Sequence, residues 1–208
     1  MWSVRYTADA LRTLSRMDPA VARRIRSKLL ALAHNPRAPN NNVKKLTGVE
    51  GYRLRVGDWR VIYTLKQQAL SVIVIKIGHR SEVLRMTRQI INQGGKPAFV
   101  VIPIDEWRRI EATLEDRIDA RAVRAFLKTP AETFPDSVAA ALLEGVHPVK
   151  ALREHRHLTQ AQLAKAAGTS AVYISQIERG GRRAGRKLLA KLAKALGVDR
   201  DLLEQDGG

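Results

Sequence analysis

The sequence of 208 residues contains no cysteine and few aromatic residues, which make up 5% of the chain. The absence of cysteine excludes disulfide scaffolds and thiolate-ligated metal sites, and it agrees with a reducing compartment. No apolar run approaches the roughly 18 residues that a membrane helix needs, and the opening residues MWSVRY do not resemble a secretory signal. We therefore expect a cytoplasmic protein with no membrane partner and with two or three small cores.

Acidic residues are also scarce, since 37 Lys and Arg stand against 20 Asp and Glu and give a net charge of +17. The excess is uneven along the chain. Residues 1–87 hold 17 basic and 5 acidic side chains, residues 104–146 hold 6 and 9, and residues 147–208 hold 12 and 6. Basic segments favour polyanionic partners, and the acidic middle segment could cover one of them within the same molecule.

The first 85 residues predict a small α+β unit with the element order β-α-α-β-β-β. Gly57 and Asp58 separate two alternating runs by the spacing of a tight hairpin turn. The β-branched run over residues 72–77 is typical of a buried central strand. We expect an antiparallel sheet packed by two helices, with strands over residues 2–6, 52–56, 59–65 and 72–77 and helices over residues 8–17 and from residue 19 to about residue 34.

Basic side chains gather on the predicted strands of this unit. Arg53 and Arg55 alternate with apolar residues and therefore share one face of their strand. Arg60 follows the hairpin turn, and His79 and Arg80 end the last strand. The four arginines could converge on one face near the histidine. An ordinary solvent-exposed face is the alternative explanation for alternating arginines.

Three motifs in this unit resemble the RelE/ParE superfamily of bacterial toxins: KLTG at 45–48, YRLRVGDWRVIY at 52–63 and IGHRSEV at 77–83. The resemblance extends over residues 2–85 and implies the fold just predicted. The RelE branch implies cleavage of mRNA in the ribosomal A site, and the ParE branch implies action on DNA gyrase. The GDWR turn and the GHR ending favour RelE, although Leu84 stands where RelE proteins commonly carry a tyrosine.

Cleavage of RNA without a metal uses the ribose 2′-OH as nucleophile. It needs a base, cations that stabilise the phosphorane and an acid for the leaving oxygen. The resemblance assigns phosphate stabilisation to Arg60 and Arg80, and RNA contact or activation to Arg53 and Arg55. Histidine titrates near neutral pH, so we predict that His79 transfers protons. No metal or other cofactor is expected.

The middle segment, residues 86–146, predicts a β-hairpin and an acidic helix from Ile104 to about Asp116. A further sequence with helical character follows and ends at Gly145. Asp136 is expected to cap the last of these helices. The words GKPAFVVIPIDEW at 95–107 resemble the N-terminal segment of Phd/YefM-type antitoxins, and a generic hairpin with a helix is the alternative. We expect this segment to contact the toxin-like unit or a second copy of the chain.

The last segment, residues 147–208, predicts an all-α unit of five helices, with Thr159 and Ser170 as helix caps. It resembles the Cro/C1-type (Xre) helix-turn-helix in the words LTQAQLA at 158–164, GTS at 168–170, ISQIERG at 174–180 and LAKALGV at 192–198. The resemblance implies that the second helix of the motif lies in the DNA major groove, usually in a dimer on two half-sites.

The resemblance also implies which side chains meet DNA. The base-facing set is Ala171, Val172, Tyr173 and Gln176, and the phosphate-contacting set is Gln160, Ser170, Arg179, Arg182 and Arg183. Gln176 is the best hydrogen-bonding reader, whereas Ala171 and Val172 favour thymine methyl groups. Packing of Tyr173 against a neighbouring helix is an equally open alternative to a base contact.

Together these segments predict a toxin–antitoxin fusion with domains over residues 1–85, 86–146 and 147–208. Its expected partners are operator DNA, ribosome-bound mRNA and its own antitoxin-like segment, in a homodimeric autorepressor. Neutralisation could occur in cis or by exchange within the dimer. Two alternatives stay open: a DNA-binding transcription regulator with an inactive toxin-like domain, and a ParE-like gyrase inhibitor.

Overall fold

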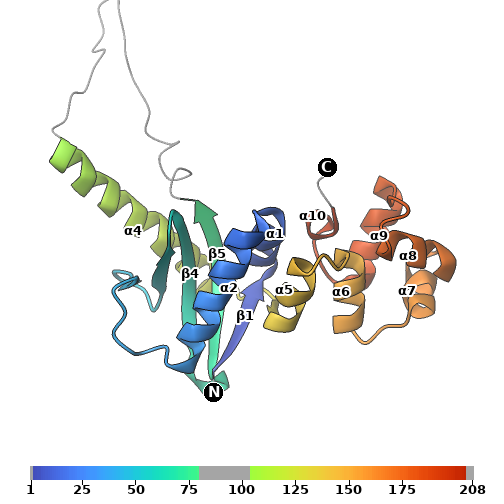
Figure 1. Cartoon of the computed structure of the whole chain (residues 1–208), viewed down its shortest axis with the longest axis horizontal. Coiled ribbons are helices and arrows are strands. Elements are labelled where there is room, and N and C mark those ends of the chain that lie inside the picture. Colours follow the sequence, from blue (N-terminus) through green and yellow to red (C-terminus); the bar gives the residue numbers. More distant parts are fainter. Residues whose placement is uncertain (1, 80–103, 205–208) are drawn as a thin grey trace, which may run out of the picture.

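The computed structural model describes residues 2–79 and 104–204 of the chain. Within these residues a sheet of six strands, in the order β2-β3-β4-β5-β1-β6, lies in one half of the molecule, and the C-terminal helices form the other half (Figure 1). The strands are β1 Ser3–Thr7, β2 Val43–Lys45, β3 Tyr52–Val56, β4 Trp59–Lys66, β5 Ser71–His79 and β6 Thr133–Pro135. β5 lies between β4 and β1, which confirms that the apolar run forms a central strand.

The sheet is mixed, so the prediction of an antiparallel sheet is wrong in one pairing. β1 runs parallel to β5, with Ser3 opposite Ser71. Apolar alternation is the same in parallel and antiparallel pairs, so the sequence pattern does not report strand direction. The three-residue strands β2 and β6 were also not predicted, because they are too short to show a period.

Helices α1 Ala8–Arg16 and α2 Pro19–His34 cover one face of the sheet. Their starts follow the sequence prediction. The Thr7 hydroxyl accepts the Ala10 N–H, and the Asp18 carboxylate accepts N–H groups at the start of α2, where Pro19 needs no acceptor. The helices bury Leu11, Leu14, Ile25 and Leu29 against sheet residues that include Leu54, Val61 and Val74.

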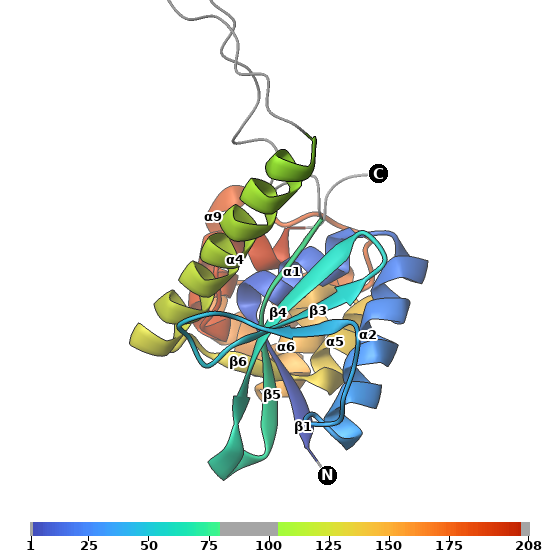
Figure 2. The same cartoon turned by 90° about the vertical axis from the view of Figure 1, so that its left-hand side faces the viewer.

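Helix α4 Ile104–Lys128 lies on the opposite face of the sheet (Figure 2). The helix continues without a break beyond Asp116, where the sequence predicted its end, because residues 117–128 contain no proline or glycine. Val123 and Phe126 of α4 pack in a second apolar cluster on Leu46, Ile62, Ile73 and Ile75. The sheet is therefore enclosed between α1 and α2 on one side and α4 on the other.

After α4 the chain adds β6 beside β1 and continues into α5 Asp136–Leu143, which packs on α1. Five further helices follow, as predicted: α6 Pro148–His155, α7 Gln160–Ala167, α8 Ala171–Glu178, α9 Arg186–Leu196 and α10 Arg200–Leu203. Thr159 and Ser170 cap α7 and α8 through their hydroxyl groups. No helix in the described residues is long and apolar enough to cross a membrane.

The helical unit and the sheet share one hydrophobic cluster, which runs through α1 and α5. Polar contacts reinforce this junction. The Arg26 guanidinium lies 2.7 Å from the Asp136 carboxylate, which also accepts the Tyr6 hydroxyl at 3.1 Å. Burial, followed by the nearby Asp136 charge, raises the pKa of Tyr6 above its ordinary value. The prediction that Asp136 caps its helix is wrong, because Pro135 holds that position and Arg26 takes the carboxylate.

Candidate functional site

Three of the predicted arginines meet on the sheet face below α4. Arg53 and Arg55 alternate along β3, and Arg55 lies directly opposite Arg60 of β4. Arg60 shares its face with Ile62, which packs in the α4 cluster. The structure therefore places these three guanidinium groups on one face, as the alternation predicted, whereas Arg80 lies outside the described residues.

Carboxylates of α4 pair with two of these arginines. Arg60 Nη2 donates to Glu115 Oε1 at 2.5 Å. Arg53 Nη1 lies 3.4 Å from Glu115 Oε2 and 3.1 Å from Asp119 Oδ2, and its Nη2 donates to Asp116. The side chains of Arg53 and Arg60 are 6% and 7% exposed. Both cations are thus removed from solvent and held by carboxylates of the same chain.

The inner face of α4 matches the sheet below it in two parts. Glu115 and Asp119 are one turn apart and lie over the arginines. Val123 and Phe126 continue the same stripe over the apolar residues of β4 and β5. A Cβ built on Gly51 would lie only 2.6 Å from Val123, so the sheet edge needs a glycine where the helix passes. Along one helix, the carboxylates therefore lie over the arginines of the sheet, and the apolar side chains lie over its apolar residues.

The ionic contact carries a cost as well as an attraction. Burial raises the pKa of Asp119, and the nearby Arg53 and Arg60 oppose this shift. Arg60 Nη1 is buried and makes no hydrogen bond within the described part of the chain, whereas the buried Asp119 Oδ2 is held by its ion pair with Arg53 at 3.1 Å. Each unsatisfied buried polar group costs about 1–3 kcal/mol. Desolvation of the charges and the unmet donor of Arg60 therefore offset part of the attraction between α4 and the sheet.

His79 does not join the arginines. It pairs with Trp59 across β4 and β5, and their ring centroids are 5.1 Å apart in an edge contact. Trp59 packs with the core on the side of α1 and α2, opposite Arg60. The expectation that His79 lies near the arginines is therefore wrong. A bulge leaves Ile75 unpaired and reverses the faces of the residues that follow it. Its assignment to proton transfer stays a prediction.

Two lysines that the sequence pattern did not single out belong to the same face. Lys44 lies opposite Arg53 in the register of β2, and its Nζ lies 2.6 Å from Asp116. Lys76 lies opposite Ile62 and is exposed, as is Arg55. The strand β2 is too short to be recognised from its pattern, which concealed Lys44. Within residues 2–79 and 104–204, no group of His, Asp and Glu side chains is arranged to hold a metal ion.

The second candidate site is the exposed side of α8. Val172 is 68% exposed, and Ser170, which caps the helix, is also exposed. Tyr173 lies beneath the Arg182 guanidinium, 4.7 Å from it, and donates its hydroxyl to the Arg183 carbonyl at 3.4 Å. Tyr173 therefore braces the loop that carries these two arginines. Half-buried Ala171 and Gln176 complete the predicted base-facing set.

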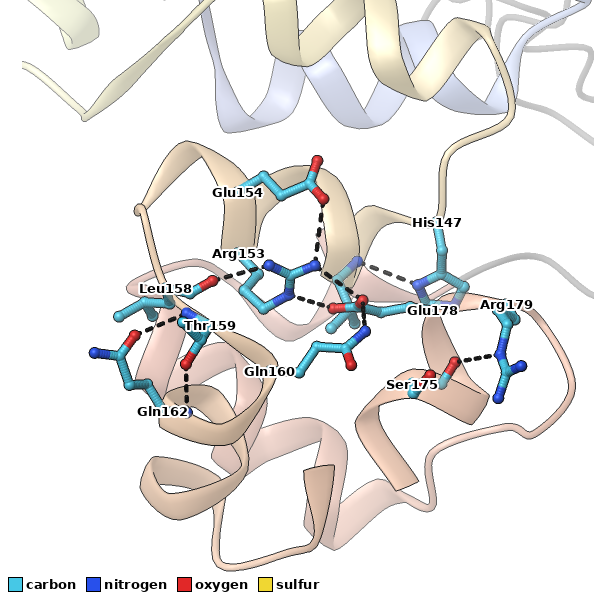
Figure 3. Close-up of polar contacts among 11 residues, drawn as sticks. His147, Arg153, Glu154, Leu158, Thr159, Gln160, Gln162, Ser175, Glu178 and Arg179 are labelled. Atoms are coloured by element: carbon cyan, nitrogen blue, oxygen red, sulfur yellow. Dashed lines mark hydrogen bonds and ion pairs between the residues drawn. The ribbon is translucent and has the colours of Figure 1, made fainter. Parts of the chain in front are cut away.

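A buried ion pair fixes α8 within the motif (Figure 3). Arg153 Nε donates to Glu178 Oε1 at 2.6 Å, and Arg153 Nη1 donates to the Leu158 carbonyl at 2.8 Å. Gln160, a predicted phosphate contact, donates its amide to Glu178 Oε2 at 2.8 Å. By contrast, Arg179 is exposed. Nothing in the sequence pattern indicated the pair, since one Arg and one Glu on helices resemble solvated side chains.

Two family models match separate parts of the chain, a toxin domain followed by a helix-turn-helix domain. Residues 4–84 match the family described as ParE toxin of type II toxin-antitoxin system, parDE. Residues 149–203 match the family described as helix-turn-helix. Neither match includes residues 85–148, so the Phd/YefM resemblance gains no support, and its residues 95–103 lie outside the described part.

Individual proteins resemble the two parts separately. An HTH-type transcriptional regulator of Mycobacterium tuberculosis is 40% identical over 55 residues, which are 26% of this chain and 39% of that protein. The chain thus spans well under half of that regulator. A RelE-like toxin protein of Escherichia coli is 24% identical over 79 residues, 38% of this chain and 83% of that protein.

Solved structures of toxins were also found. The intact E. coli RelBE toxin-antitoxin complex shows 22% identity and a TM-score of 0.34, over 38% of this chain and 96% of that chain. The archaeal RelE-RelB complex from Pyrococcus horikoshii shows 26% identity and a TM-score of 0.35, over 38% and 94%.

Proposed function

We propose that this protein is a self-inhibited toxin–antitoxin fusion. Its sheet face is an RNA-cleaving site of the RelE kind, α4 is the inhibitor, and the helix-turn-helix domain binds operator DNA and represses the protein's own gene. The observation that carries this proposal is the burial of Arg53 and Arg60 against Glu115, Asp116 and Asp119.

The inhibition follows from the chemistry of the face. Guanidinium groups bind phosphate through charge-assisted hydrogen bonds and stabilise the charge that develops on a phosphorane. Carboxylate oxygens of Glu115 and Asp116 occupy those donors in place of phosphate oxygens. An RNA phosphate and α4 therefore exclude each other at Arg53 and Arg60. Arg55 and Lys76 remain exposed beside the covered groups and extend the face that RNA would meet.

The connection between α4 and β6 supports inhibition in cis. Only residues 129–132 separate the end of α4 from β6, which is hydrogen-bonded to β1 of the same sheet. Such a short tether gives the inhibitor a high effective concentration. The close approach of Gly51 and Val123 indicates a specific fit between α4 and the sheet.

Two other functions have an observation in their favour. The position of His79 on the opposite face from Arg60 favours a DNA-binding regulator whose toxin-like domain lacks a proton-transfer group. The match of residues 4–84 to the ParE family favours gyrase as the target.

Charge reversal on α4 separates these functions. Glu115→Arg with Asp116→Arg in the full chain repels α4 from Arg53 and Arg60 without changing the sheet. We expect growth arrest and cleavage of ribosome-bound mRNA, both abolished by adding Arg60→Ala. Glu144→Arg with Asp199→Arg changes the charge equally at exposed positions and is expected to be harmless.

Each alternative outcome has a meaning. If digestion with a protease shows that α4 is released and neither RNA nor gyrase is affected, the toxin-like domain is inactive. If gyrase is inhibited and mRNA stays intact, the target is that of ParE. Either result contradicts the proposed RNase.

A further inference from the structure

The outer side of α4 carries an uninterrupted row of basic residues. Arg117, Arg121, Arg124 and Lys128 follow one another at helical spacing, and all four are exposed. We call these four residues the outer stripe. They lie on the side of the helix opposite Glu115, Asp119 and the other residues that face the sheet.

The two sides of this part of α4 separate charge by sign. From residue 111 to residue 128, all the acidic residues are half-buried or buried, and all the basic residues are exposed. The basic residues form no ion pair within the described part of the chain. An ordinary solvated helix gains stability from opposite charges three or four residues apart, at about 0.2–0.5 kcal/mol per pair, and loses similar amounts from like charges. The outer stripe contains three such like-charge neighbours, which a polyanion would relieve.

The dimensions and place of the outer stripe fit a single strand of RNA. Its ends are eleven residues apart, which corresponds to about 16 Å of helix. That length suits a few successive phosphates. The helix-turn-helix domain lies at the other end of the long axis of the molecule from α4, so a duplex seated on α8 is remote from the stripe (Figure 1). The outer stripe instead belongs to α4, the helix whose inner side covers Arg53 and Arg60.

We propose that the outer stripe binds single-stranded RNA through its phosphates while α4 covers the sheet face. Each bound phosphate replaces condensed counterions on the RNA, so the binding is strongly dependent on salt. The closed chain is then an RNA-binding protein in its own right, independent of any nuclease activity. RNA on the outside of α4 is also held beside the face that opens when the helix leaves.

The test uses the full chain and a fluorescein-labelled 12-nucleotide RNA, 2′-O-methylated so that cleavage plays no part. Fluorescence anisotropy gives the Kd between 50 and 200 mM KCl. We expect Arg117→Gln with Arg121→Gln and Arg124→Gln to weaken binding at least tenfold at 50 mM. The slope of log K against log salt should fall by about 2, because each single-strand phosphate that the variant no longer neutralises lowers it by about 0.7.

A matched variant on the other side of the sheet controls for net charge. Arg23→Gln with Arg24→Gln and Lys28→Gln removes the same charge from exposed positions of α2, and we expect less than a twofold change. Equal losses of affinity in the two variants, or no loss in the stripe variant, would overturn the proposal. Retardation of the promoter duplex should be unchanged in the stripe variant, and its loss would assign the stripe to DNA instead. Thermal unfolding of the stripe variant should occur at a temperature no lower than that of the parent protein, because the substitutions remove the three like-charge pairs.

Discussion

Two arginine-rich surfaces in this molecule are in opposite states. On the sheet, Arg53 and Arg60 are buried and bound by carboxylates of α4. On the helix-turn-helix domain, Arg179, Arg182 and Arg183 are exposed to solvent. The guanidinium groups on the sheet are therefore covered, whereas those on the helix-turn-helix domain are accessible. We call the first the closed surface and the second the open surface. Under the proposed function, the chain binds DNA while its toxin-like face stays covered, and only the sheet surface needs a change of structure before it can act.

The largest effect should come from removing one carboxylate at the closed surface. Glu115→Gln leaves Arg60 buried with no ionised partner at 2.5 Å, and breaking a buried pair in this way costs about 3–5 kcal/mol. We expect the free energy of unfolding in urea to fall by that order and amide exchange in α4 to accelerate. Glu144→Gln, at an exposed position of the same charge, should change neither. Unchanged exchange in α4 would show that the ion pair does not hold the helix.

The open surface should respond in DNA binding alone. Arg182→Ala with Arg183→Ala removes two predicted phosphate contacts and should weaken retardation of the promoter duplex about 100-fold at low salt. Exchange in α4 should stay at its wild-type rate, because the two surfaces are remote from each other (Figure 1). Full retention of binding would remove these arginines from the DNA interface.

A steric change should weaken the closed surface to a smaller extent. Gly51→Ala places a methyl group within 2.6 Å of Val123, and overpacking of this kind costs about 1–3 kcal/mol. The expected readout is faster exchange in α4 with unchanged DNA retardation. Gly185→Ala meets no atom within 4 Å and serves as the control. Equal rates of exchange in the two variants would show that the absence of a side chain at Gly51 is not needed for α4 to pack on the sheet.

The smallest effect concerns pH at the start of the helix-turn-helix domain. His147 Nδ1 accepts the Val149 N–H at 3.2 Å, and burial lowers the pKa of His147 below its ordinary value of 6.5. The stabilisation is therefore complete above pH 6.5 and is lost as the pH falls through the lower folded value. A cap of this kind contributes about 1 kcal/mol. His147→Asn keeps an acceptor and should unfold with less dependence on pH between 7.5 and 5, whereas an identical dependence would contradict this account.

Much of the structure of these two surfaces was predictable from the sequence. The alternation of Arg53 and Arg55 and the hairpin at Gly57 predicted the shared face, and the sequence pattern over residues 147–208 predicted all five helices of the C-terminal unit. The acidic composition of residues 104–146 also indicated a segment that could cover a basic one.

Other features depend on contacts that a sequence pattern does not report. The bulge at Ile75 places His79 on the face opposite Arg60, although the sequence around Ile75 does not indicate a bulge. The pairing of Asp119 with Arg53, and of Asp136 with Arg26, joins residues far apart in the chain. Such pairs become visible only when the packing of α4 and α5 on the sheet is known.

The most direct test of the closed surface exploits the absence of cysteine. A Cβ on Gly51 lies 3.2 Å from the Val123 Cβ, close to the range of about 3.5–4.5 Å in disulfides. In the chain with Gly51→Cys and Val123→Cys, oxidation locks α4 in place, whereas the reduced side chains crowd the helix. We predict that cleavage of ribosome-bound mRNA is absent in the oxidised protein and appears on reduction. Equal cleavage in the two forms, or none in either, would contradict the proposal that α4 closes an RNA-cleaving site.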